Sequence, residues 1–98
     1  MLKKTYTKTG KVCRVTFSLP PELKAAKASL CGDFNSWNSR SHPMKPLKNG
    51  GFSLTVSLPT GFIYEFRYLL DGKRWENDQA PDALVSNEFG SENSVIQI

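Results

Sequence analysis

The chain has 98 residues, of which 39% are hydrophobic and 22% are charged, and it carries a formal net charge of +4 at pH 7. These values are typical of an ordinary globular protein, and the length leaves room for one hydrophobic core, so we expect residues 1–98 to form a single domain. No apolar run approaches the roughly 18 residues that a membrane-spanning helix needs, and no apolar stretch follows the basic N-terminus, so we expect no membrane partner, no signal peptide and a cytoplasmic location.

Strand signals dominate the first half of the chain. From Lys11 to Leu19 apolar and polar residues alternate, which predicts a strand whose inward face is formed by Cys13, Val15, Phe17 and Leu19. Two prolines end this strand, because proline cannot donate to a sheet ladder, and residues 22–27 are predicted to be a connection. A short strand is predicted over residues 28–32. The polar stretch 33–43 is predicted to be a long loop.

Turn signals separate the strands of the second half. Asn49-Gly50-Gly51 divides a short segment at 44–47 from a strand at 52–58, and Pro59-Thr60-Gly61 precedes a strand at 62–70. Asp71-Gly72 marks the next turn, and strands are predicted at 83–86 and 94–98. About seven to eight short strands in a chain of this length predict an all-β fold, an immunoglobulin-like β-sandwich.

The basic N-terminus and the two cysteines have simple interpretations. Five basic residues fall before residue 15, and such a cluster could contact nucleic acid. We instead expect residues 1–10 to be a solvated flexible or edge segment, and no nucleic-acid partner. Cys13 and Cys31 fit no metal-binding spacing. We expect two buried, reduced thiols, the alternative being a disulfide between neighbouring strands, and no metal or cofactor.

Residues that could catalyse a reaction are sparse. His42 is the only histidine, and no serine or cysteine motif accompanies it, so we expect it to be a surface residue. Asp33, Asp71, Asp78 and Asp82 lie in or beside turns, where an aspartate side chain accepts hydrogen bonds from backbone amides. Paired carboxylates hydrolyse glycosides only when a cleft holds them at a defined separation. We therefore expect a protein that is not an enzyme.

Two tryptophans stand apart from the other aromatic residues. Trp37 and Trp75 lie in polar segments, whereas Phe17, Phe52 and Phe66 alternate along strands and are expected in the core. A flat indole ring can stack on the apolar face of a pyranose while neighbouring polar side chains bond its hydroxyls. The same rings can stack on nucleic-acid bases. Composition alone leaves both alternatives open.

The order of several short motifs identifies a family. The chain carries Gly32-Asp33-Phe34-Asn35-Ser36-Trp37, Tyr64-Glu65-Phe66-Arg67-Tyr68, Asp71-Gly72, Trp75-Glu76-Asn77-Asp78 and Gly90-Ser91-Glu92-Asn93. In this combination it resembles the family-48 carbohydrate-binding modules, also called isoamylase N-terminal-like or early-set domains. It is similar to the glycogen-binding domain of the AMP-activated protein kinase beta subunit. The resemblance runs from about Val12 to Ile98.

The resemblance implies an early-set β-sandwich that binds α-1,4-linked glucans such as glycogen, starch and maltooligosaccharides. By position it implies that Trp37 and Trp75 stack on the sugar and that Arg67 bonds its hydroxyls. It implies further contacts from a later loop, through Phe89, Ser91 and Asn93.

The chain departs from the family pattern at three points. Arg67 stands where the family has a lysine, and Phe89 stands where leucine is frequent. One extra residue, Lys73 or Arg74, lengthens the turn before Trp75. Because some family members bind no sugar, the alternative is a protein-interaction domain that docks on a glucan-metabolising enzyme or a signalling partner.

Overall fold

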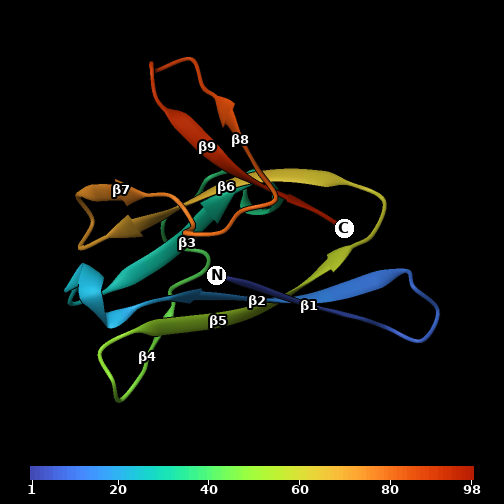
Figure 1. The fold of residues 1–98 in the computed structure, drawn as a ribbon, viewed down its shortest axis with the longest axis horizontal. Helices are drawn as coiled ribbons and strands as arrows, with labels where there is room; N and C mark the ends of the chain where they lie inside the picture. Colours follow the sequence, from blue (N-terminus) through green and yellow to red (C-terminus); the bar gives the residue numbers. More distant parts are fainter.

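Two antiparallel sheets packed face to face make up the computed structural model, which describes all residues from Met1 to Ile98 (Figure 1). The first sheet has the order β1-β2-β5-β4, with strands β1 (Leu2–Tyr6), β2 (Val12–Leu19), β5 (Phe52–Pro59) and β4 (Lys45–Pro46). The second sheet has the order β3-β6-β9-β8, with strands β3 (Ala28–Gly32), β6 (Ile63–Leu70), β9 (Glu92–Gln97) and β8 (Ala83–Ser86). The prediction of an all-β sandwich is confirmed.

Short elements complete the two sheets. Strand β7 (Arg74–Glu76) pairs with β6, and the 3₁₀ turns η1 (Pro21–Leu23) and η2 (Asp33–Asn35) follow β2 and β3. No helix of the structure is long and apolar enough to cross a membrane.

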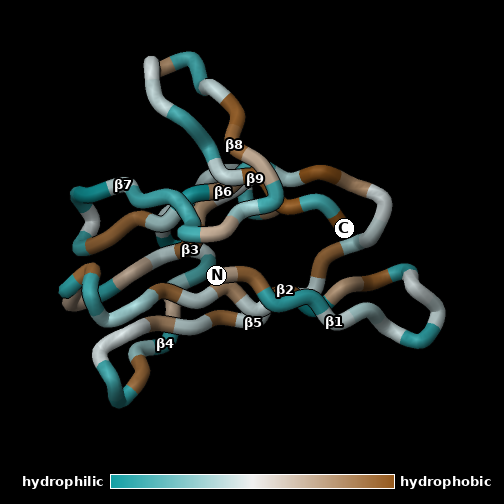
Figure 2. The backbone as a smooth tube through the Cα atoms, in the orientation of Figure 1, coloured by the Kyte–Doolittle hydropathy of each residue, from teal (hydrophilic) through white to brown (hydrophobic).

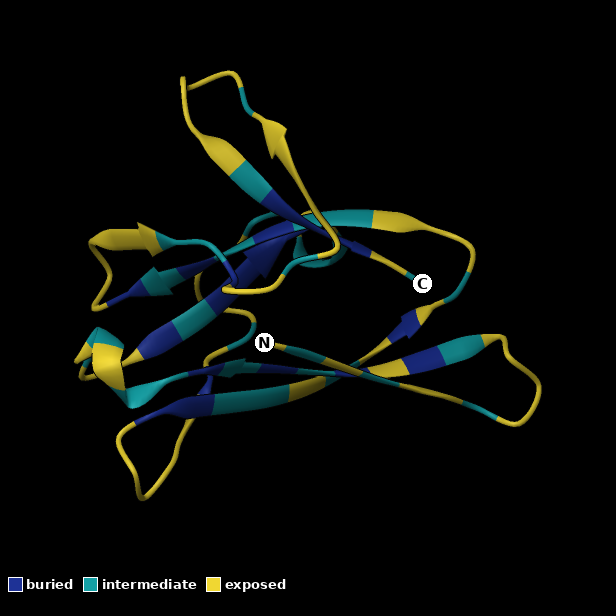
Figure 3. Ribbon diagram, in the orientation of Figure 1, coloured by how far each residue is buried: buried dark blue, intermediate teal, exposed yellow.

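The core lies between the sheets and follows the predicted alternation. All four residues predicted to point inward from β2 are buried, and Phe66, Tyr68 and Leu70 of β6 meet them from the other sheet. The rings of Phe17 and Phe66 pack edge to face across the core, with their centroids 5.1 Å apart. Figure 3 shows the buried residues along the strands of both sheets and the exposed residues at the hairpin turns. The outer faces are therefore free to carry functional side chains.

The structure has nine strands, where seven to eight were expected, and β1 and β7 are the two that coincide with no predicted strand. Strand β1 pairs with β2 over its whole length, from Leu2 opposite Phe17 to Tyr6 opposite Cys13. The β1 segment shows little apolar alternation because it is an edge strand whose side chains are mostly exposed. Strand β7 is only three residues long and places Trp75 in a strand rather than a loop.

The turn between β6 and β7 absorbs the extra residue noted in the sequence. Asp71 and Gly72 both adopt positive φ, +54° and +67°, as a tight hairpin turn requires. Leu70 pairs with Arg74 rather than with Lys73, so Lys73 is the residue left between the turn and the ladder. Beyond it the register resumes, and Trp75 lies opposite Leu69 on β6.

Both cysteines are buried and unbonded, as predicted. Burial raises the pKa of the Cys31 thiol above its ordinary value. Tyr68 is another buried polar group, and its hydroxyl donates a hydrogen bond to the Asp78 carboxylate. Desolvation, and secondly the negative charge of Asp78, raise the pKa of Tyr68, so this phenol stays protonated.

Candidate functional site

A groove of about 750 Å³ opens where β6, β7 and the β8–β9 hairpin meet the segment after β3. Strands β9 and β7 lie along the same edge of β6, one beside its first half and the other beside its second half. Side chains from four separate segments therefore converge on one surface. The groove is lined by Trp37, Glu65, Arg67, Trp75, Ser86, Asn87, Glu88, Phe89 and Asn93.

Five of the six residues that the sequence analysis assigned to a sugar site line this groove. The sixth, Ser91, does not. It lies exposed on the β8–β9 loop, and its backbone N–H donates to the Asn87 side chain.

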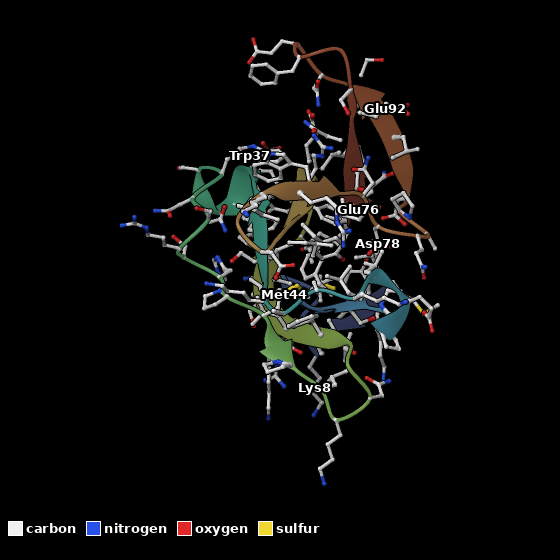
Figure 4. All side chains as sticks on the ribbon, turned by 90° about the vertical axis from the view of Figure 1, so that its left-hand side faces the viewer. Lys8, Trp37, Met44, Glu76, Asp78 and Glu92 are labelled. Atoms are coloured by element: carbon white, nitrogen blue, oxygen red, sulfur yellow. The ribbon has the colours of Figure 1, made fainter.

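The two tryptophans touch each other. Their ring centroids are 6.4 Å apart and the ring planes cross at 63°, an edge-to-face contact. Figure 4 shows Trp37 on the segment that follows β3, beside the ribbon of β7. Trp75 keeps 42% of its surface exposed. The pair thus forms one angled aromatic surface along the groove.

A strained turn holds Trp37 in this place. Ser36 and Trp37 both adopt left-handed φ values, +55° and +58°, a conformation that costs a bulky L-residue roughly 1–2 kcal/mol. The Trp37 backbone N–H donates to the Gly32 carbonyl at 2.9 Å. Its indole Nε1–H donates to Asp33 Oδ1 at 3.1 Å. These bonds offset the strain and fix the direction of the ring.

Asp33 also ties this turn to the neighbouring strand. Its second carboxylate oxygen, Oδ2, accepts a hydrogen bond from the backbone N–H of Glu65 at 2.8 Å. One carboxylate therefore connects the Trp37 indole with the part of β6 that carries Glu65 and Arg67.

Gly32 allows the turn to lie close to β6. A Cβ atom at this position would lie 2.7 Å from the Glu65 carbonyl oxygen and 2.9 Å from the Phe34 ring. Asn35 secures the same turn, because it accepts from the Gly32 N–H and donates to the Leu30 carbonyl. The Gly-Asp-Phe-Asn-Ser-Trp motif thus has a local structural reason for most of its residues.

Arg67 lies against Trp75. Its guanidinium carbon Cζ is 5.6 Å from the centroid of the Trp75 ring, a cation–π arrangement. The Nε–H of Arg67 is buried and has no protein hydrogen-bond partner. Arg67 in this structure supports the aromatic surface and still has donors to offer.

A chain of amide and carboxylate groups closes the other side of the groove. Asn93 Nδ2 donates to Glu65 Oε1, and Asn87 Nδ2 donates to Asn93 Oδ1, each at 3.1 Å. The side-chain oxygen Oδ1 of Asn87 accepts from the backbone N–H groups of Phe89 and Ser91 and so orders the hairpin tip. Phe89 stands at this tip with 85% of its surface exposed.

Four further residues line the groove that were not predicted from the sequence: Glu65, Ser86, Asn87 and Glu88. A signal existed for Glu65, because it lies two residues before Arg67 on one strand, and residues so spaced share a face. No local pattern marked Ser86, Asn87 or Glu88, which reach the groove through the path of the β8–β9 hairpin.

Residues considered for catalysis have structural contacts instead. His42 is partly buried rather than a simple surface residue, since its Nδ1 is 2.8 Å from Asn35 Nδ2 and its ring packs on Phe34. Asp71 accepts from the backbone N–H groups of Ala26 and Lys27. The structure contains no group of three or more His, Cys, Asp or Glu residues that could hold a metal ion.

Comparison with known protein families identifies the part of the chain that forms the groove. No curated protein matches the chain. A family model, described as the glycogen recognition site of AMP-activated protein kinase, matches residues 21–98. The match covers the whole second sheet and every residue that lines the groove. The chain therefore belongs to this family of carbohydrate-binding modules, the glycogen recognition site of AMP-activated protein kinase.

Proposed function

We propose that this domain binds α-1,4-linked glucans, namely glycogen, starch and maltooligosaccharides, in the groove between Trp37 and Phe89, and that it does so without catalysis. Family membership supports the binding of a glucan polysaccharide. The observation that carries the proposal is the angled surface of Trp37 and Trp75, whose centroids are 6.4 Å apart, beside free polar groups.

The groove offers both kinds of contact that a sugar needs. The apolar face of a pyranose can lie on the exposed part of Trp75. An α-1,4-linked chain turns from one glucose unit to the next, and the two tryptophan rings, whose planes cross at 63°, can contact successive units of such a chain. Arg67 supplies guanidinium donors, and Asn93, Glu65 and Asn87 supply amide and carboxylate groups at the opposite wall. Because the groove contains both a cation, Arg67, and carboxylates, Glu65 and Glu88, it favours a neutral ligand over a charged one.

Phe89 extends the aromatic surface beyond the two tryptophans. Its ring is almost fully exposed at the hairpin tip yet belongs to the groove wall. An exposed aromatic side chain costs free energy in water, and a sugar ring lying against it would remove part of that cost. We propose that Phe89 covers the sugar from the side opposite Trp37.

Titration with maltoheptaose, followed by tryptophan fluorescence, tests the proposal. Both tryptophans line the groove, so binding should change their emission, and cellohexaose, with β-1,4 linkages, should bind more weakly. Trp75→Ala should abolish the response to maltoheptaose. Phe62→Ala is the matched control, because Phe62 is an exposed aromatic residue outside the groove.

Two outcomes would overturn this function. One is the absence of a fluorescence change and of calorimetric heat at millimolar maltoheptaose. The other is equal affinity of the wild type and Trp75→Ala. Either result would favour the alternative, a protein-interaction domain of the same fold that docks on a glucan-metabolising enzyme or signalling partner without binding sugar itself. The cytoplasmic location stays a prediction from the sequence.

A further inference from the structure

Charge is divided unequally between the two sheets. The strands and hairpin turns of the first sheet, residues 1–19 and 44–59, contain none of the nine carboxylates of the chain. The same segments hold more than half of its 13 basic residues: Lys3, Lys4, Lys8, Lys11, Arg14, Lys45 and Lys48. The net charge of +4 is therefore the balance of these cationic segments and the rest of the chain, which holds all nine carboxylates and the other six basic residues.

The outer face of the first sheet combines these cations with hydroxyl groups. The inward residues of β2 are buried, so their neighbours point outward, and the pairing registers place Lys3 and Lys45 on the same side as Arg14. Between them lie six serine and threonine side chains: Thr5, Thr16, Ser18, Ser53, Thr55 and Ser57. Thr16 and Thr55 bond to each other across the strands at 2.9 Å. We call this surface the basic face.

The cations of the basic face have no partner within the protein. Lys4 is the one basic residue of this sheet in an ion pair, with Asp82. Lys3, Arg14 and Lys45 are all exposed and form no salt bridge. Their charge is available to an external anion.

One end of the face has a hollow that suits a phosphate group. It measures about 260 Å³ at the β1–β2 hairpin and is lined by Thr5, Tyr6, Thr7, Lys8 and Arg14. These residues bring two cations and three hydroxyl groups to one place. Phosphate oxygens often accept hydrogen bonds from side chains of these kinds.

We propose that the basic face docks on the surface of an anionic lipid bilayer through its phosphate headgroups. A protein partner is disfavoured, because stable protein interfaces are depleted in Lys and Ser and centre on clusters of aromatic and Arg residues, whereas Arg14 is the one such residue among the outward positions of β2 and β5. A nucleic acid is disfavoured, because Tyr6 at the hairpin hollow is a single aromatic ring beside the face, whereas single-stranded nucleic acids stack successive bases on several rings. Binding to a fluid, flat lipid surface requires only that the protein present positive charge and hydrogen-bond donors.

The proposed contact is independent of the glucan site. The groove is lined by residues of the second sheet and of the segment after β3, and the basic face lies on the outer side of the first sheet. The two sheets form separate layers (Figure 1), with the core between them. Both surfaces can therefore be occupied together. The contact is peripheral and needs no membrane-spanning segment, and it revises the expectation from the sequence that no membrane is a partner.

Vesicle co-sedimentation tests the inference. The probes are phosphatidylcholine vesicles with and without phosphatidylglycerol. The protein should bind only the anionic vesicles, and rising salt should release it. The variant Lys3→Gln/Arg14→Gln/Lys45→Gln should lower the partition coefficient on the order of 100-fold. The matched control Lys24→Gln/Lys27→Gln/Lys73→Gln loses the same net charge outside the first sheet and should bind nearly as well as the wild type.

Three results would overturn the inference. They are no binding to anionic vesicles at low salt, equal loss in the two triple variants, and tighter retention on poly-L-glutamate or duplex RNA than on the vesicles. Both variants should keep the far-ultraviolet circular dichroism and the maltoheptaose affinity of the wild type. A change in maltoheptaose affinity alone would concern the proposed function and not the basic face.

Discussion

The guanidinium of Arg67 lies over the indole ring of Trp75, with Cζ 5.6 Å from the ring centroid. The family resemblance assigned Arg67 a hydrogen-bonding role towards sugar, in the place of a lysine. The structure adds that a planar arginine head can stack on the ring, which an ammonium group cannot do in the same way. Arg67 therefore contributes to two proposed contacts with the sugar. It holds the Trp75 ring that stacks on the sugar, and its remaining N–H groups can donate hydrogen bonds to the sugar hydroxyls.

Substitution of Arg67 by lysine should separate these two contributions. Arg67→Lys keeps the charge but loses the planar stack, whose contribution at an exposed site is about 0.5–1 kcal/mol, so maltoheptaose affinity should fall about two- to fivefold. Time-resolved fluorescence anisotropy should show a more mobile Trp75, most clearly in a Trp37→Phe background that leaves one emitting tryptophan. Unchanged anisotropy would mean that the stack does not restrain the ring.

Asp33 is predicted to set the orientation of Trp37. Its two oxygens accept from the Trp37 indole and from the Glu65 backbone N–H. Hydrogen bonds to a charged group contribute about 1.5–3 kcal/mol each, and both bonds of Asp33 are exposed to solvent. Asp33→Ala should therefore lower stability in urea unfolding by about 1.5–3 kcal/mol in total. In the wild type, the edge-to-face tryptophan pair should produce an exciton couplet in circular dichroism. In Asp33→Ala this couplet should disappear.

The matched variant for this test is Asp33→Asn. Asparagine keeps one oxygen acceptor, so it should retain part of the couplet and part of the maltoheptaose affinity. Trp37→Phe and Trp75→Phe establish that the couplet arises from this pair of rings. A couplet that survives in Asp33→Ala would contradict the assigned role.

Local patterns in the sequence predicted most of the strands, because alternation and turn chemistry act over a few residues, whereas the family resemblance implied that Trp37 and Trp75 share one site. Strand β2 is an example, since its inward face follows from period-two alternation alone. The strand state of Trp75 depends instead on the pairing of β7 with β6. The position of Ser91 depends on how Asn87 folds the hairpin tip. Such long-range pairings and loop paths leave no signature in local composition.

Phe89 and Ser91 should differ in their effect on sugar binding, although they lie in the same hairpin tip. Phe89 lines the groove and is 85% exposed, whereas Ser91 does not line it. Phe89→Ala should leave the urea midpoint nearly unchanged and weaken maltoheptaose binding about two- to tenfold, by loss of an aromatic contact of about 0.5–1.5 kcal/mol. Ser91→Ala should change neither quantity. Isothermal titration calorimetry gives the affinities, and a larger effect of Ser91→Ala than of Phe89→Ala would refute this ordering.

Gly32→Ala should destabilise the turn that carries Trp37. The added Cβ would lie 2.7 Å from the backbone oxygen of Glu65, which cannot move without disturbing β6. Overpacking of this kind costs typically 1–3 kcal/mol, so the urea midpoint should fall and maltoheptaose binding should weaken with it. Ser29→Ala on the same strand is the control and should have a small effect. A Gly32→Ala variant with wild-type stability and affinity would show that the turn can move away from β6.

Acid should destabilise the fold through Asp71. Backbone hydrogen bonds, first from Lys27 and then from Ala26, hold the pKa of Asp71 below its ordinary value of 3.8. Because the folded pKa is the lower one, the carboxylate stabilises the fold above pH 3.8, and this contribution is lost as the pH falls through the folded pKa. Asparagine tolerates the positive φ of Asp71 and accepts similar bonds but does not titrate. The difference in urea midpoint between wild type and Asp71→Asn should therefore shrink from about pH 5 to about pH 3; a constant difference would exclude Asp71 as the source of the acid sensitivity.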